Sequence, residues 1–159
     1  MHAIELASRQ RAVKLDRRRL RAAIAAVLAD SPYTRSTVSL AVVDDATIHQ
    51  LNREYLDHDW PTDVLSFVLD DDPPALEGEL IVSADTAVRE APRYGWGGHD
   101  ELLLYVIHGC LHLVGCDDQT PTARRKMRRL EGRYLAQFDL KPHNRRRRAA
   151  RPAGGSRRA

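Results

Sequence analysis

Two histidines four residues apart have the clearest capacity for chemistry in this sequence. His108 and His112 lie on one face of a predicted helix, one turn apart, because an α-helix has 3.6 residues per turn. Two imidazoles at this spacing can bind one metal ion, as in metalloenzymes with an H-E-x-x-H motif. Gly115 favours a sharp turn that can return a third ligand to the same ion. The preferred third ligand is Asp118, and the alternatives are Asp117 and Cys116.

The residue types of this cluster favour zinc, because imidazole nitrogen and carboxylate oxygen are both good zinc ligands. Three protein ligands leave a fourth position for water, whose pKa zinc lowers to about 7. We therefore predict one Zn²⁺ ion bound by His108, His112 and Asp118, with the two histidines acting in catalysis through the metal-bound water. Gly109 occupies the position of the general base in H-E-x-x-H proteases, which disfavours a peptidase.

Several helices and strands must position this cluster. The apolar run 102–107 predicts a buried helix that carries both histidines, with Asp100 as its N-cap. Other helices are predicted over 17–29 (capped by Asp16), from 44 or 45 to 55, from 85 to 91 and from 120 or 122 to 138, and strands over 37–43, 64–69 and 79–83. The last two strands are expected to form an antiparallel hairpin around an acidic loop that begins with residues 70–72. This order predicts an α+β (α/β-like) fold, a single domain with a small mixed sheet packed against helices and the histidines on a central helix.

Composition places the chain among ordinary globular proteins. It has 159 residues, 43% of them hydrophobic and 30% charged, which suits one domain with a substantial core. No apolar run approaches the roughly 20 residues that span a bilayer, and the first residues lack a signal-peptide pattern. Two cysteines, Cys110 and Cys116, do not make a disulfide framework and are predicted to be core residues. We expect a cytoplasmic protein that does not bind membranes.

Basic residues are concentrated at the end of the chain. Residues 140–159 contain eight basic residues and no acid, so residues 1–139 have a net charge of −5. We predict a folded domain over 1–140 and a basic, disordered tail over 141–159. The tail either contacts nucleic acid or is a solvated extension, and its composition favours neither interpretation.

Three sequence blocks resemble those of a known family. Residues 108–118 read HGCLHLVGCDD and resemble the motif H-G-x-L-H-L-x-G-x-D-H of the YbeY family, bacterial rRNA maturation factors that are single-strand-specific endoribonucleases. Residues 51–67 resemble the family block L-N-x-x-Y-R-x-x-D-x-P-T-D-V-L-S-F, and residues 78–83 resemble G-D-I-x-I-S. The blocks occur in the family's order, and the resemblance covers about residues 35–139.

The resemblance implies that His108, His112 and residue 118 bind zinc. The third ligand is histidine in the family and Asp118 here, and aspartate is a competent zinc ligand. The family's arginine in the block L-N-x-x-Y-R is Leu56 here, and leucine cannot contact a phosphate. We predict Arg53, one turn earlier, as the catalytic arginine. A positively lined groove would receive RNA, with Arg53, Arg89 and Arg93 as candidate contacts.

The resemblance also implies a function. It predicts a single-strand-specific, metal-dependent endoribonuclease in late ribosome quality control and 3′-end maturation of 16S rRNA. The expected partners are single-stranded RNA, ribosomal RNA and the small ribosomal subunit. Leu56 and Asp118 favour an alternative, a catalytically weak ribosome-associated maturation factor. A third hypothesis is another zinc-dependent hydrolase.

Overall fold

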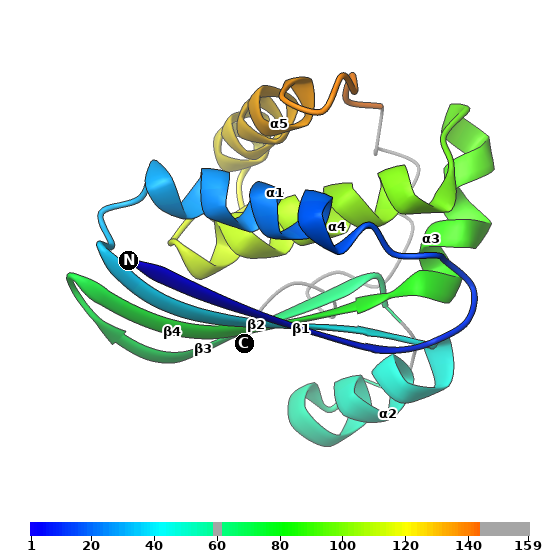
Figure 1. Ribbon diagram of the computed structural model, residues 1–159, viewed down its shortest axis with the longest axis horizontal. Coiled ribbons are helices and arrows are strands. Elements are labelled where there is room, and N and C mark those ends of the chain that lie inside the picture. Colours follow the sequence, from blue (N-terminus) through cyan, green and yellow to red (C-terminus); the bar gives the residue numbers. More distant parts are fainter. Residues whose placement is uncertain (59–61, 144–159) are drawn as a thin grey trace.

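The protein forms a four-stranded mixed sheet with helices on both faces (Figure 1). A computed structural model describes residues 1–58 and 62–143. The elements are β1 (His2–Arg9), α1 (Arg17–Ala29), β2 (Arg35–Val43), α2 (Asp45–Leu56), β3 (Val64–Asp72), β4 (Ala75–Ser83), α3 (Ala84–Glu90), the 3₁₀ helix η1 (Ala91–Tyr94), α4 (Gly98–Leu113) and α5 (Pro121–Ala136).

The sheet has the strand order β1-β2-β4-β3. Strand β2 pairs in parallel with both β1 and β4, whereas β3 pairs antiparallel with β4. Successive side chains of a strand point to opposite faces of the sheet, so alternate apolar residues of β2 and β4 enter the core on one side. The predicted mixed sheet and hairpin are both confirmed.

The two faces of the sheet carry cores of different size. Helices α1 and α4 cover one face, with α5 beyond them, and α2 packs on the other face (Figure 1). The larger core lies under α1 and α4, and the smaller one joins Ile48 of α2 to Leu65 and Ile81 of the sheet. Helix α4 contacts α1, α3, α5, β3 and β4, and it is buried along most of its length. The α+β fold with a central histidine-bearing helix is therefore confirmed.

The first strand was absent from the predicted order of elements. In β1, Ile4 and Leu6 alternate with Ala3, Glu5 and Ala7, which are exposed. Two large apolar residues in an edge strand give a weak periodic signal, and pairing with β2 supplies the remaining stability. The prediction for the acidic residues 70–72 was also wrong. They continue β3 instead of forming a loop, and Asp71 accepts a hydrogen bond from the Tyr33 hydroxyl at 2.7 Å.

The predicted cap of α1 is confirmed, and of the two predicted starts of α5 the structure has Thr120. Asp16 accepts a hydrogen bond from the Arg19 N–H, and Thr120 does the same for α5. The predicted cap Asp100 was wrong by three positions, because α4 begins at Gly98. Asp100 instead accepts a hydrogen bond from the Gly97 N–H at 3.2 Å. Helix α3, predicted to begin at residue 85, begins at Ala84 and is capped by Ser83.

The end of the described chain folds back onto α4. His143 lies 2.9 Å from the Glu101 carboxylate and is buried beside it. The packed structure therefore continues three residues past the predicted boundary at 140. The division into a domain and a tail stays a prediction, and residues 144–159 lie outside the described part of the chain. Within residues 1–58 and 62–143, no helix has the length and apolar character that crossing a bilayer requires.

Candidate metal centre

His108 and His112 face each other from consecutive turns of α4. Their Nε2 atoms are 3.1 Å apart, and their rings meet at 71°. The Asp118 Oδ2 atom lies 3.7 Å from the His108 Nε2 and 3.8 Å from the His112 Nε2. The side chain of His108 is 3% exposed and that of Asp118 is 21% exposed, so the cluster opens to solvent on the Asp118 side. The structure thus brings the three predicted ligands together.

The turn after α4 returns Asp118 to the histidines. Gly115 has a φ of +103°, a conformation that glycine adopts without strain. Its N–H donates to the His112 carbonyl at 3.1 Å, and the next N–H, of Cys116, donates to the Leu111 carbonyl at 3.0 Å. These bonds reverse the chain within a few residues and place Asp118 beside the helix that it follows.

The two alternative ligands have other environments. The Asp117 carboxylate accepts a hydrogen bond from the Gln119 N–H at 3.0 Å. Cys116 packs against the main core, and burial raises the pKa of its thiol despite the nearby Lys126. Burial also raises the pKa of Cys110 to about 12. The side chain that lies beside both histidine Nε2 atoms is that of Asp118.

A carboxylate from α5 orients the first histidine. The Nδ1 of His108 pairs with the Glu131 carboxylate, and both side chains are buried. An ionised Glu131 carboxylate would accept a hydrogen bond from Nδ1–H, and that tautomer leaves the Nε2 lone pair directed at His112 and Asp118. Such a contact fixes the tautomer and orientation of a metal ligand.

Glu131 was missed by sequence reasoning. Along α5 it lies four residues after Met127 and three before Tyr134, both of which are buried. A single acid on the apolar face of a helix requires a buried partner, because an unpaired buried charge is costly. This pattern was available in the sequence, but the sequence does not identify His108 as the partner.

Gly109 has a packing role between the two histidines. A Cβ atom at this position would lie 2.9 Å from the Val64 Cγ2 and 3.0 Å from the Leu80 Cδ2. The Gly109 carbonyl also accepts a hydrogen bond from the Ser66 hydroxyl at 3.1 Å. A side chain at position 109 would therefore point into the sheet, so this position cannot supply the general base of a peptidase.

The spacing of the three donor atoms fits a zinc ion. Tetrahedral ligands about 2.1 Å from zinc are about 3.4 Å from one another. The nitrogen–nitrogen distance here is 3.1 Å, and the two nitrogen–oxygen distances are 3.7 and 3.8 Å. With two imidazoles and one carboxylate, both the chemistry and the spacing suit a small divalent cation.

The predicted arginines lie outside this cluster. Arg53 is in the last turn of α2, which packs on the sheet face opposite α4 (Figure 1). Leu56, at the position of the family's arginine, packs against the smaller core. Arg89 pairs with Asp45 at 2.9 Å, and Arg93 lies 3.6 Å from Glu90. A catalytic role for Arg53, and RNA contacts for all three arginines, stay predictions.

Asp45 is held in its ionised form. Burial alone would raise its pKa, but hydrogen bonds from Ser83 at 2.6 Å and Thr86 at 2.8 Å act in the opposite direction. The Arg89 guanidinium adds to them at 2.9 Å, and the pKa of Asp45 falls below its ordinary value. This network joins α2 to α3 and is structural.

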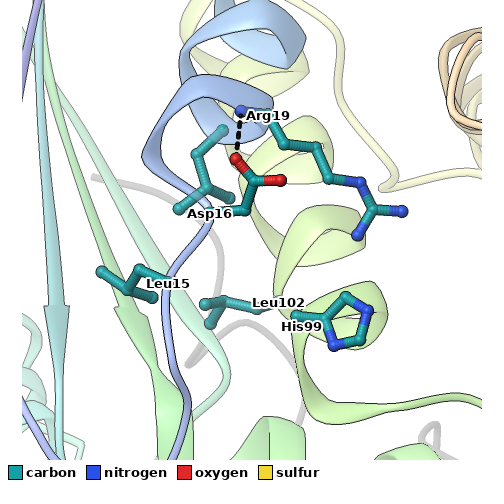
Figure 2. Close-up of a pocket in the computed structure, with 6 residues that line it drawn as sticks. Leu15, Asp16, Arg19, His99 and Leu102 are labelled. Carbon is teal, nitrogen blue, oxygen red and sulfur yellow. Dashed lines mark hydrogen bonds between the residues drawn. The ribbon is translucent and has the colours of Figure 1, made fainter.

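A small pocket lies at the other end of α4 (Figure 2). Its lining residues are Leu15, Asp16, Arg19, Leu20, His99 and Leu102. Asp16 caps α1, and Arg19 pairs with Asp100 at 3.1 Å. The polar groups around this pocket thus hold α1 against α4. His99 precedes His108 by nine residues, about 14 Å along the helix, so the pocket is separate from the metal cluster.

Comparisons with known proteins match most of the chain. The family model described as Endoribonuclease YbeY matches residues 5–139. A protein from Rhodopirellula baltica named Endoribonuclease YbeY is 51% identical over 112 residues, which cover 69% of this chain and 57% of that protein. Proteins of the same name from Salinibacter ruber and Syntrophotalea carbinolica are 39% and 37% identical and are covered over 83% and 95% of their lengths.

A solved structure has the same fold. The solution structure of TM1509 from Thermotoga maritima is similar to this chain with a TM-score of 0.57 and 22% identity. The similarity covers 99% of this chain and 100% of that one. At this level of identity the likeness supports the fold alone.

Proposed function

Because the chain belongs to the YbeY endoribonuclease family, we propose that it is a metal-dependent endoribonuclease that cleaves single-stranded RNA at the His108–His112–Asp118 cluster. The observation that carries this proposal is the convergence of the three donor atoms within 4.8 Å of one another. They come from α4 and the turn after it, within the segment that the family model matches.

The residues of the cluster have distinct roles in this proposal. His108 and His112 offer their Nε2 atoms to the metal, and Glu131 holds the His108 ring in the required tautomer. Asp118 supplies the third ligand atom and is the member of the cluster that solvent reaches. A zinc ion held there would act as a Lewis acid that stabilises negative charge on a phosphodiester.

The nucleophile has to reach the cluster from the side of Asp118. His108 is buried and Gly109 is packed against the sheet, so neither gives access from the sheet side. The nucleophile is a water molecule or the 2′-hydroxyl of the RNA, and both approach through the same opening. The substrate phosphate therefore lies on the exposed side of Asp118.

The biological substrate that we propose is ribosomal RNA. The resemblance of the three sequence blocks supports a role in 3′-end maturation of 16S rRNA and ribosome quality control, with the small ribosomal subunit as partner. The eight basic residues between positions 140 and 159 provide charge for such a partner. These processes place the protein in the cytoplasm.

A second candidate is a ribosome-associated maturation factor with weak nuclease activity. The observation that favours it is Leu56, which packs against the smaller core of Val43, Ile48, Leu65 and Ile81 where the family's arginine would stand. This factor would co-sediment with small ribosomal subunits and bind zinc, but purified protein would cleave RNA weakly or not at all.

The test is cleavage of a 5′-labelled single-stranded RNA by purified, zinc-loaded protein. We expect cleavage of the single strand and not of the matched duplex, loss of cleavage with a chelator, and its return with added zinc. His108→Ala should remove cleavage. His99→Ala is the matched control, because His99 is an exposed histidine on the same helix. Full cleavage by His108→Ala would refute the proposal.

A further inference from the structure

Helix α5 carries the highest density of basic residues among the described elements. Its basic face consists of Arg124, Arg125, Lys126, Arg128, Arg129 and Arg133. The one acid of the helix, Glu131, is buried against His108. Outside α5, residues 1–139 contain 11 basic and 21 acidic residues, so this concentration of positive charge is local.

Most of this charge has no acidic partner. Arg133 lies 3.6 Å from Asp30, and Arg125 donates to the Thr122 hydroxyl at 3.3 Å. Within residues 1–58 and 62–143, no carboxylate forms an ion pair with Arg124, Arg125, Lys126, Arg128 or Arg129. Four of these five side chains are exposed and Arg128 is half-buried. The basic face of α5 is therefore available to an anionic partner.

The basic face of α5 begins next to the loop between α4 and α5, which carries Asp118. Arg124 donates a hydrogen bond to the Asp118 carbonyl at 3.3 Å, so the first turn of α5 touches the residue that supplies the third metal ligand. The positive charge thus adjoins the solvent-exposed side of the cluster.

One residue of the basic face is also a helix neighbour of Glu131, the residue of α5 that contacts His108. Arg128 lies four residues after Arg124 and three before Glu131, and residues at this spacing are neighbours on a helix surface. From Arg124 to Arg133 the helix rises roughly 14 Å. A row of cations of this length beside a metal site suits an extended polyanion better than a single small anion.

We infer that the basic face of α5 binds the phosphate backbone of single-stranded RNA and leads the strand to the His108–His112–Asp118 cluster. This inference rests on the proposed function and assigns its substrate-binding surface. It also provides phosphate contacts that Leu56 cannot make, since Leu56 stands where the family block L-N-x-x-Y-R has its arginine. The arginines contact phosphates and not bases, so binding along α5 is independent of RNA sequence.

The test is equilibrium binding of a fluorescent single-stranded RNA in the His108→Ala background, in which the RNA remains intact. The variant Arg125→Gln/Lys126→Gln/Arg129→Gln removes three exposed charges and leaves Arg124 and Glu131 unchanged. We expect its Kd to rise at least about 10-fold and the slope of log K against log salt to fall by about 2, at roughly 0.7 for each phosphate contact.

Two control variants separate a specific surface from general charge. Arg17→Gln/Arg18→Gln/Arg21→Gln removes the same charge from exposed positions of α1 and should change Kd less than about 2-fold. Arg125→Lys/Arg129→Lys keeps the charge and should keep the salt slope, and it also shows that substitution of these positions leaves the protein folded.

The inference is overturned if the α5 triple variant binds RNA as its parent does, or if the α1 variant weakens binding equally. Tighter binding of a polyglutamate peptide than of RNA would also overturn it and would assign the face to an acidic protein. Failure of the inference is distinguishable from failure of the proposed function, because cleavage by zinc-loaded protein with native histidines is measured separately. If the protein with native histidines cleaves RNA and the α5 triple variant binds RNA with unaltered Kd, the RNA binds to another surface.

Discussion

Two buried histidine–glutamate pairs connect α4 to later parts of the described chain, and only one of them includes a residue of the candidate metal cluster. His108 of α4 pairs with Glu131 of α5, and His143 pairs with Glu101 of α4. The carboxylates are 2% and 0% exposed, and the histidines are 3% and 7% exposed. In burial and in partner chemistry the two pairs are nearly the same.

The two pairs differ in what surrounds the rest of the imidazole. The Nε2 of His108 faces His112 and Asp118. The ring of His143 stacks on Tyr94, with centroids 3.6 Å apart, and meets the edge of Trp96. Its Nδ1 has no hydrogen-bond partner in the described part of the chain. A buried histidine–glutamate pair thus orients a ligand in one place and anchors a chain segment in the other, and the neighbours of the second nitrogen decide which.

The largest expected difference between the two sites is in catalysis. His112→Ala removes a ligand atom of the metal cluster, and we expect RNA cleavage to fall at least about 10²-fold, more than the loss of an outer contact would cause. His143→Ala should cleave at nearly the wild-type rate. The measurement is the initial rate of cleavage of single-stranded RNA at saturating zinc. Equal loss in both variants would remove the distinction between the pairs.

The next largest effect is on stability, and it belongs to the second pair. His143→Ala leaves the buried Glu101 carboxylate without this partner, which we expect to lower the free energy of unfolding by about 3 kcal/mol. His99→Ala, on the exposed surface of the same helix, should change it by less than about 0.5 kcal/mol. Urea denaturation followed by circular dichroism measures both. An unchanged midpoint for His143→Ala would show that this contact does not anchor the chain end.

A smaller effect tests the role of each glutamate. Glu131→Gln weakens the hydrogen bond that orients His108, and we expect the Kd for zinc to rise about 10- to 100-fold. Glu101→Gln makes the same change in the other pair and should leave zinc affinity unaltered. Competition with a chromophoric chelator measures both constants. Identical affinities for the two variants would show that Glu131 does not orient a ligand.

The smallest expected effect concerns an ion pair outside both histidine sites. The pKa of Asp45 is below its ordinary value, so the unfolded chain takes up this proton at a higher pH than the folded protein does. Its contribution to stability is therefore complete above about pH 5 and is lost as the pH falls through the lower, folded value. Stability of wild type should decline more steeply below pH 5 than that of Asp45→Asn, as measured by urea denaturation. If the free energy of unfolding of both proteins fell in parallel with pH, the Asp45 carboxylate would not contribute to stability.

The convergence of His108, His112 and Asp118 could be predicted because the three residues are close in sequence. His108 and His112 are related by one helical turn, and a glycine turn brings Asp118 back within six residues. The helix and strand patterns likewise depend on short-range periodicity. For that reason the hairpin β3–β4 and the central helix were predicted correctly.

The parts that the sequence did not predict depend on tertiary contacts. Glu131 and His108 are 23 residues apart, and only the packing of α5 on α4 joins them. Glu101 and His143 are 42 residues apart, and the predicted boundary at 140 excluded His143 from the domain. Strand β1 forms because β2 offers it a parallel edge, which its own residues do not encode.

The distinction between the two histidine pairs is tested most directly by the metal content of three proteins purified in parallel. Wild type, His108→Ala and His143→Ala are stripped with a chelator, exposed to excess zinc, desalted and measured by mass spectrometry of the metal. We predict one zinc ion per chain in wild type and in His143→Ala, and none in His108→Ala. Equal zinc in all three proteins would contradict a metal centre at His108, His112 and Asp118.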